Sequence, residues 1–292
     1  MVFLAGVAAA FALGLGWVLQ QRVAAHAALS ELLSFRLLLH LMGKRVWWLG
    51  IAAMIAGQAL GGWAFELGSV ALIEPLLSTN LLFAFVIAAC LNRKRIRWRE
   101  VCGALLLSAA LGVFIAIGNP RAAHNFTPPF ATVLLAVSIV GAVVAVIVAV
   151  GKGRGLVTES VLFATAAGVL YGLQDVGTRA ALLTVERHGL IGLLSAPWAY
   201  LVFGSAVLGL LLSQSAFRAA RLDYSLPPTA AAEPIVGIAL GVTVLGDIVS
   251  VSDTGLAVEF ACLAAMVAGV VLIGRSGTLA HHVSHHMQRI GH

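Results

Sequence analysis

The stretch LGSVALIEPLLSTNLLFAFVIAACL, residues 67–91, carries an acid and a proline, Glu74-Pro75, inside a long apolar segment. The same pair recurs as Glu233-Pro234 in a second apolar stretch, SLPPTAAAEPIVGIALGVTVLG, residues 225–246. An ionisable side chain in a membrane-spanning segment is costly and normally serves a function. The repeated pair therefore indicates a duplicated membrane unit with a polar centre. Each copy is followed at the same interval by a second glutamate, Glu100 or Glu259.

The composition excludes a soluble domain. Of the 292 residues, 61% are hydrophobic and only 10% are charged, with a mean hydropathy of +1.01. A soluble domain of this size would leave large apolar patches in water. The apolar runs are continuous and do not alternate, which favours spanning helices of about 20 residues over a β-barrel. We expect an all-α polytopic membrane protein of the cell membrane.

About nine transmembrane helices are predicted, with the third kept as one helix through Pro75. A connector, residues 20–45, is leucine-rich but charged, so we expect an interfacial amphipathic helix there. Proline in the first helical turn favours a helix start after Ser195-Ala196. The expected spans are residues 2–19, 46–65, 67–91, 101–117, 130–150, 156–182 and 197–216, a run starting after Pro227-Pro228, and residues 256–274.

Loop charges predict the orientation. With the N-terminus outside and the C-terminus in the cytoplasm, 15 of the 18 lysine and arginine residues fall on the cytoplasmic side. Cytoplasmic loops carry such an excess of basic residues. The net charge of +6 is therefore explained by topology, and we expect no nucleic-acid partner.

Two alignments without internal gaps relate the halves of the chain. Residues 14–29 lie on 168–183, and residues 74–113 lie on 233–272. An offset of five spans inverts the second copy, as in the inverted repeats of secondary transporters. The expected parts are a first four-helix repeat (1–118), a loop and central linker helix (119–155), a second inverted four-helix repeat (156–275) and a histidine-rich cytosolic tail (276–292).

Several segments resemble the drug/metabolite transporter (EamA-like) superfamily. The basic turn at residues 92–96 before the helix containing residues 103–107, and Leu245-Gly246-Asp247, look like parts of its four-helix unit. The stretch from Val46 through Ala64-Phe65 to Pro75-Leu76, and Pro128-Pro129-Phe130, resemble the NIPA-type magnesium transporter branch more closely. The resemblance implies a transporter of inverted repeats, with Mg²⁺ as one substrate.

Glu74 and Glu233 are the first candidates for substrate binding. Pro75 and Pro234 break the helix and free the carbonyl oxygen four residues earlier, which can then accept a hydrogen bond from a ligand or water. A carboxylate in a low dielectric could exchange a proton for a cation. The alternative is a structural hydrogen bond beside a kink.

Polar residues in other apolar runs form a second group of candidates. The repeat alignment matches Gln20 with Gln174, next to Asp175, and pairs Gln58 with Gln214. Amides and a carboxylate could coordinate a polar solute, or could form hydrogen bonds between helices. Asn80 is a further candidate. Glu100 and Glu259 are expected at helix starts, where an acid complements the helix dipole.

The tail offers possible metal ligands, because His281 with His285, and His282 with His286, have i, i+4 spacing. A solvated tail is the alternative.

The sequence carries no hydrolase or nucleotide-binding motif, so we expect neither an enzyme nor a cofactor. The expected function is a secondary transporter that moves a small solute by alternating access, coupled to protons or a cation. The alternatives are a Mg²⁺ transporter and a non-transporting membrane scaffold. Expected partners are the solute and the bilayer, and a homodimer stays open.

Overall fold

In the part of the chain that the computed structural model describes, regular structure is helical throughout. The described residues are 1–67, 76–77, 79–91, 98–118, 130–246, 258 and 261–273. The elements are α1 (Val2–Ala24), a 3₁₀ turn η1 (Leu29–Glu31), α2 (Phe35–Met42), α3 (Arg45–Leu67), α5 (Asn80–Leu91), α6 (Trp98–Gly118), α7 (Phe130–Gly151), α8 (Leu156–Ser195), α9 (Pro197–Ala219), α10 (Leu222–Leu245) and a further helix, Ala261–Ile273.

Six of the described helices are long and apolar enough to cross a membrane: α1, α3 to Ala64, α7 from Ala131, α8 to Gly189, α9 and α10. A helix of 23 residues, such as α1, is about 35 Å long, which spans the ~30 Å hydrocarbon core. The helices Asn80–Leu91 and Ala261–Ile273 are apolar but shorter. A multi-span helical membrane protein is therefore confirmed, whereas nine spans and an inverted repeat stay predictions.

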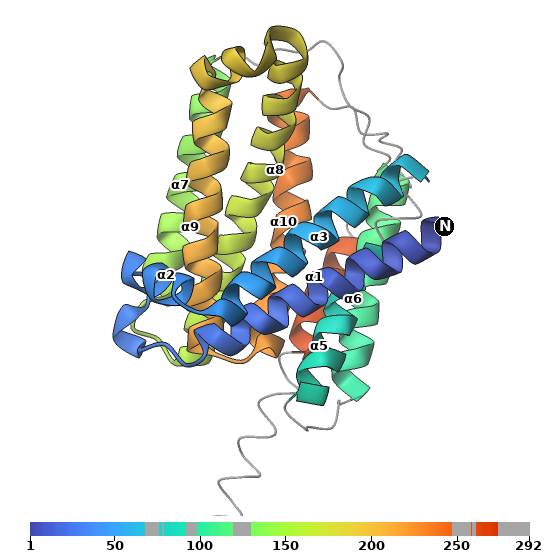
Figure 1. The fold of residues 1–292 in the computed structure, drawn as a ribbon, viewed down its shortest axis with the longest axis vertical. Helices are drawn as coiled ribbons and strands as arrows, with labels where there is room; N and C mark the ends of the chain where they lie inside the picture. The colour runs from blue at the N-terminus through green and yellow to red at the C-terminus, as the bar shows by residue number, and fades with distance from the viewer. Residues whose placement is uncertain are drawn as a thin grey trace, which may run out of the picture.

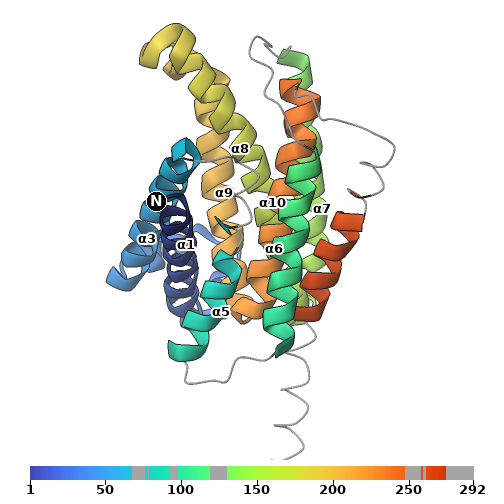
Figure 2. The same cartoon turned by 90° about the vertical axis from the view of Figure 1, so that its right-hand side faces the viewer.

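The helices form two neighbouring groups. In the first, α1 packs against α3 and α5, and in the second, α8 packs against α7, α9 and α10 (Figure 1). In Figure 2, α1 and α3 lie at one side, helix 261–273 lies at the other, and α5 and α6 lie between them. A buried apolar cluster joins the groups, with Trp47 of α3, Phe85 of α5 and Phe217 of α9 among its members.

The backbones of α6 and helix 261–273 meet closely at two glycines. A Cβ on Gly103 would lie 2.9 Å from the carbonyl oxygen of Gly269, and a Cβ on Gly269 would lie 2.9 Å from that of Gly103. Small residues permit such close helix contact in membranes. The last described helix is thereby fixed against the N-terminal half of the chain.

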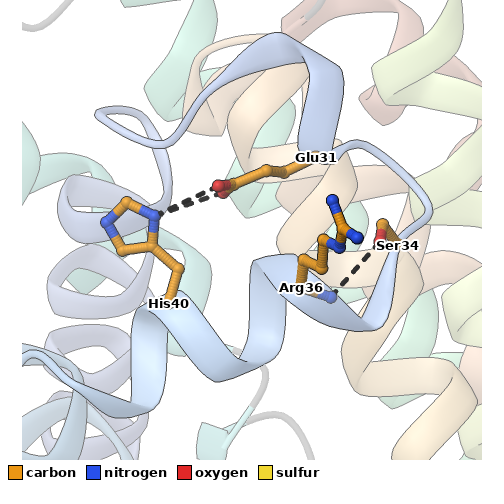
Figure 3. Close-up of polar contacts among 4 residues, drawn as sticks. All are labelled: Glu31, Ser34, Arg36 and His40. Atoms are coloured by element: carbon orange, nitrogen blue, oxygen red, sulfur yellow. Dashed lines mark hydrogen bonds and ion pairs between the residues drawn. The ribbon is translucent and has the colours of Figure 1, made fainter.

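The connector between α1 and α3 differs from its prediction. α1 continues to Ala24, and only the short helix α2 is amphipathic, with Leu37 and Leu41 fully buried in the shared core. Figure 3 shows how α2 is held: the Ser34 hydroxyl accepts from the backbone N–H of Arg36 at 3.3 Å, and His40 pairs with Glu31 at 3.2 Å. The predicted helix over the whole connector was wrong because it packs as short pieces against the protein.

The connector is also tied to the second group of helices. The backbone N–H of Leu33 donates to the Ser215 hydroxyl of α9 at 3.1 Å. Leu33 has a φ of 57°, in the left-handed region that a leucine rarely adopts. The contact with α9 therefore helps to hold a strained turn.

The start of α10 corrects a prediction. The helix begins at Leu222, so Pro227 and Pro228 lie inside it and do not precede it. Proline lacks the N–H that bonds to the carbonyl four residues earlier, which is why the sequence favoured a later start. The turn before the prolines is buried, with Ser225 and Leu226 almost fully enclosed, and packing holds it helical despite the lost hydrogen bonds.

α8 is longer than predicted and contains a break. It runs to Ser195, and Gly189 has a φ of 67° and a ψ of −177°. Beyond the break, Ala196 occupies the cap position, and Pro197 is the first residue of α9, as predicted. The break separates the spanning part of α8 from a short helical segment before α9.

Replacing Gly189 by alanine is expected to destabilise the protein, because its backbone conformation is accessible almost only to glycine. Such a strained residue costs about 1–3 kcal/mol. The apparent melting temperature of the purified protein in detergent measures the effect. Gly204→Ala is the control, since a Cβ there has no neighbour within 4 Å. Equal melting of the two variants would contradict the prediction.

Candidate functional site

Two predicted glutamines form a buried contact between α1 and α9. Gln20 is 1% exposed and Gln214 is 0% exposed. The Gln214 Nε2 donates to the Gln20 Oε1, and the Gln20 Nε2 lies 2.8 Å from the Met54 sulfur. One turn earlier on α1, the rings of Trp17 and Phe217 meet edge to face, with centroids 5.8 Å apart. Apolar packing therefore encloses an amide pair that joins the two groups of helices.

Glycines on α1 allow it to pack closely against α3 and α5, which positions Gln20 near its C-terminal end. A Cβ on Gly14 would lie 2.7 Å from the Asn80 carbonyl oxygen of α5, and one on Gly16 would lie 2.9 Å from the Gly50 carbonyl oxygen of α3. α1 is thus wedged between two neighbours, and Gln20, one turn beyond Gly16, points to α9. The other amide atom of Gln214, its Oε1, is buried and accepts no hydrogen bond among the described residues.

The contact between α8 and α10 holds a second set of predicted residues. A Cβ on Gly172 would lie 2.6 Å from the Glu233 carbonyl oxygen, and one on Gly237 would lie 3.9 Å from the Asp175 Oδ2. The segments that carry the two acids are therefore in direct contact. Gln174 precedes Asp175 on α8, and its buried Oε1 has no hydrogen-bond partner within the described ranges.

The remaining predicted residues take no part in the glutamine pair or in the contact between the acid-bearing segments, and Asn80 contributes only its carbonyl oxygen, against Gly14. Gln58 is exposed on α3, and Asn80 is half-buried as the first residue of α5. Glu74, Pro75 and the tail residues His281, His282, His285 and His286 lie outside the described residues. In the part of the chain that is described, no three histidine, cysteine, aspartate or glutamate side chains are grouped to hold a metal ion.

A cavity of about 380 Å³ lies where α1, α5, α6 and α10 end or begin. Its walls come from both groups of helices, because α10 belongs to the second. The lining residues are Val18, Gln21, Arg22, Ala25 and His26 of α1 and its end, Phe85, Ala88, Ala89 and Leu91 of α5, Glu100 of α6, and Arg221, Leu222 and Asp223 at the start of α10.

Charges of both signs line this cavity. Asp223 is 5% exposed and Glu100 is 9% exposed. The Arg221 Nε donates to the Asp223 Oδ1 at 3.1 Å, whereas the Asp223 Oδ2 is buried without a hydrogen-bond partner among the described residues. Both acids lie in the first turn of a helix, where the helix dipole favours a negative charge. Arg22 lies in the last turn of α1, where a positive charge is favoured.

Sequence reasoning missed this cavity. It placed Glu100 at a helix start, as the structure does, but it explained the loop arginines by membrane topology and did not single out Arg22, Arg221 or Asp223. The available signal was an acid two residues after an arginine at the edge of a long apolar run. What brings these residues together is the meeting of helix ends from distant parts of the chain.

Comparisons with known proteins give one relative and no family. The chain is 29% identical over 286 residues to an uncharacterised protein of Corynebacterium glutamicum, an alignment that covers 96% of each chain. No family model and no solved structure matches the chain. The chain is thus a multi-span helical membrane protein homologous to that uncharacterised protein over almost its whole length.

Proposed function

We propose that this protein is a secondary transporter of the drug/metabolite type, which moves a small solute by alternating access between two inverted halves. The observation that carries the proposal is the charged cavity of about 380 Å³ between helices of both groups. Small-molecule sites have volumes of about 300–1,000 Å³ and combine apolar walls with a few polar groups. A membrane scaffold needs no such cavity.

The helix contacts support the proposed repeat. α1 contacts α3 and α5 in the first half, and α8 contacts α9 and α10 in the second, in the order that the alignment requires. Gly14 and Gly168, which the alignment matches, each lie against the third helix of their own half, at Asn80 and at Thr229. Matched glycines that each contact the third helix of their own half are expected if the halves share one fold, although Asn80 and Thr229 themselves are not matched by the alignment.

The glutamines suggest how access could alternate. In the proposed repeat, Gln20 corresponds to Gln174 and Gln58 to Gln214, so two equivalent pairs can form between the halves. One of them, Gln20 with Gln214, is made in this structure. In the other pair, Gln58 is exposed and the Gln174 Oε1 is buried without a described partner. In the opposite state, we propose, Gln58 pairs with Gln174 and the Gln20–Gln214 contact opens.

The test is uptake into proteoliposomes that contain the purified protein, with a panel of amines, amino acids and Mg²⁺, with and without a pH gradient. Glu233→Gln, combined with Glu74→Gln, removes both acids of the repeated pair while keeping side-chain size. We expect at least a tenfold loss of flux, because the variant lacks the carboxylates that would bind a cationic group or a proton inside the membrane. Glu31→Gln, at the exposed contact with His40, is the matched control.

The outcomes separate the candidate functions. Flux of an organic solute that depends on the pH gradient and is lost in the double variant supports the proposal. Mg²⁺ uptake with the same loss would place the chain with magnesium transporters. If the protein moves nothing, the transporter proposal is overturned. If the double variant transports as well as the parent, the role assigned to Glu74 and Glu233 is overturned.

A further inference from the structure

We propose that the cavity between α1, α5, α6 and α10 binds a small zwitterion, a molecule with an ammonium group, a carboxylate and an apolar part, such as an apolar amino acid. The inference rests on the proposed function and specifies the substrate class for a site at the helix ends, where the sequence predicted no substrate contact. The inference is based on a partly open cavity whose lining carries two carboxylates, two guanidinium groups and an apolar surface.

The ammonium side of the site is Asp223, and Glu100 is a second carboxylate in the same lining. The Asp223 carboxylate is 95% enclosed by protein, and Arg221 uses only its Oδ1. The Oδ2 has no hydrogen-bond donor among the described residues, although burying an unsatisfied carboxylate oxygen is unfavourable. A ligand ammonium group supplies three donors and a compensating charge. We place the ligand ammonium group against the Asp223 carboxylate, because its Oδ2 lacks a donor among the described residues.

The carboxylate side of the site is Arg22 with Arg221. Arg221 is half exposed even though its Nε contacts Asp223, which leaves its terminal nitrogens available to a second carboxylate. Guanidinium groups favour carboxylates because their N–H donors match the two oxygens. His26 follows Arg22 around the same wall, and its Nδ1 contacts the Arg22 carbonyl oxygen at 2.7 Å.

The apolar part of the ligand has its own surface. Val18, Phe85 and Leu222 line the cavity between the charged groups. Burial of a leucine-sized side chain against such a wall contributes about 1.5–3 kcal/mol. The volume of about 380 Å³ holds a molecule of amino-acid size with room for water.

The balance of charge selects a zwitterion over a simple ion. Arg22 and Arg221 offset Glu100 and Asp223, so the wall carries no net charge when these four groups are ionised. An anion alone would contact the arginines and leave the Asp223 Oδ2 without a donor among the described residues. A cation alone would leave Arg22 and the terminal nitrogens of Arg221 without a ligand carboxylate, since only the Arg221 Nε contacts Asp223. Only a ligand with both charges completes both sides.

The experiment measures binding to the full-length protein in detergent by isothermal titration calorimetry, with three matched probes. L-leucine carries both charges, L-leucinamide has only the ammonium charge, and 4-methylpentanoate has only the carboxylate. We expect leucine to bind at least tenfold more tightly than either analogue, because loss of one hydrogen-bonded charge costs about one factor of ten or more. Equal affinity for the three probes, or no binding of leucine, would overturn the proposal.

Variants assign the binding to this cavity. Asp223→Asn keeps the shape and removes the charge, so leucine affinity is expected to fall at least tenfold. Glu159→Gln is the matched control: Glu159 is another buried acid at a helix start, 8% exposed, but it accepts from the Gly153 N–H away from the cavity. Leucine binding that survives in Asp223→Asn overturns the site.

A second variant keeps the test decisive if Asp223→Asn does not fold. Arg22→Gln changes an exposed residue at the rim and is expected to weaken leucine while leaving leucinamide unchanged. Equal loss of both probes would overturn the assignment of the carboxylate side. Leucine binding without flux of any solute would uphold the site and overturn the transporter proposal, whereas flux of other solutes without leucine binding would overturn only this inference.

Discussion

Gly172→Ala is expected to separate α8 from α10 and to lower both the melting temperature and the transport activity. A Cβ at this position would lie 2.6 Å from the Glu233 carbonyl oxygen and 2.8 Å from the Gly237 backbone nitrogen. Both are backbone atoms, so no side-chain rotation can relieve the clash and the helices must move apart. Overpacking of this kind costs about 1–3 kcal/mol.

Flux should fall by more than the loss of folded protein explains, because the helices that move carry Asp175 and Glu233. The measurements are the apparent melting temperature in detergent and the flux of the substrate found in the proteoliposome screen. Gly141→Ala in α7 is the matched control, since a Cβ there meets nothing within 4 Å. A Gly172→Ala protein that melts and transports as Gly141→Ala does would show that α8 and α10 do not pack as described.

Gln214→Leu is expected to destabilise the protein, and adding Gln20→Leu is expected to restore much of the loss. The single change leaves the Gln20 Oε1, in a side chain 1% exposed, without its donor. A buried polar group that loses its partner costs about 1–3 kcal/mol, whereas replacing both partners by apolar groups can be nearly neutral. The two changes should therefore be strongly non-additive.

Melting temperatures of the parent, both single variants and the double variant form the cycle, with Gln58→Leu as the control for an exposed glutamine. If the pair also opens during transport, the double variant should be stable but altered in flux. Additive effects on melting would mean that the two amides do not act as a pair, and the proposed exchange between the glutamine pairs would lose its support.

The sequence predicted the class of fold because hydropathy is a property of local stretches. The spans that became α1, α3 and α7 begin within a residue or two of their predicted starts. The wrong start predicted for α10 also has a local cause. Pro227 and Pro228 favour a helix that begins after them, and burial of the turn before them lets α10 begin at Leu222 instead.

The site was less predictable, because it depends on which distant segments meet. Gln20 and Gln214 were each chosen as polar residues in apolar runs, but the alignment related them to other glutamines and not to one another. Asp223 was not chosen at all, since a charge beside an apolar run resembles an ordinary loop charge. Its importance follows from the convergence of α1, α6 and α10, which no local pattern encodes.

The contact between Gln20 and Gln214 also has a consequence for biosynthesis. Its two residues are 194 positions apart, so the donor to the Gln20 Oε1 is not yet translated when α1 enters the membrane. At about 5–20 residues per second, the delay is roughly 10–40 s. During that interval the Gln20 Oε1 on α1 faces lipid or the insertion machinery without its Gln214 donor. A nascent chain that stops before α9 never forms this hydrogen bond.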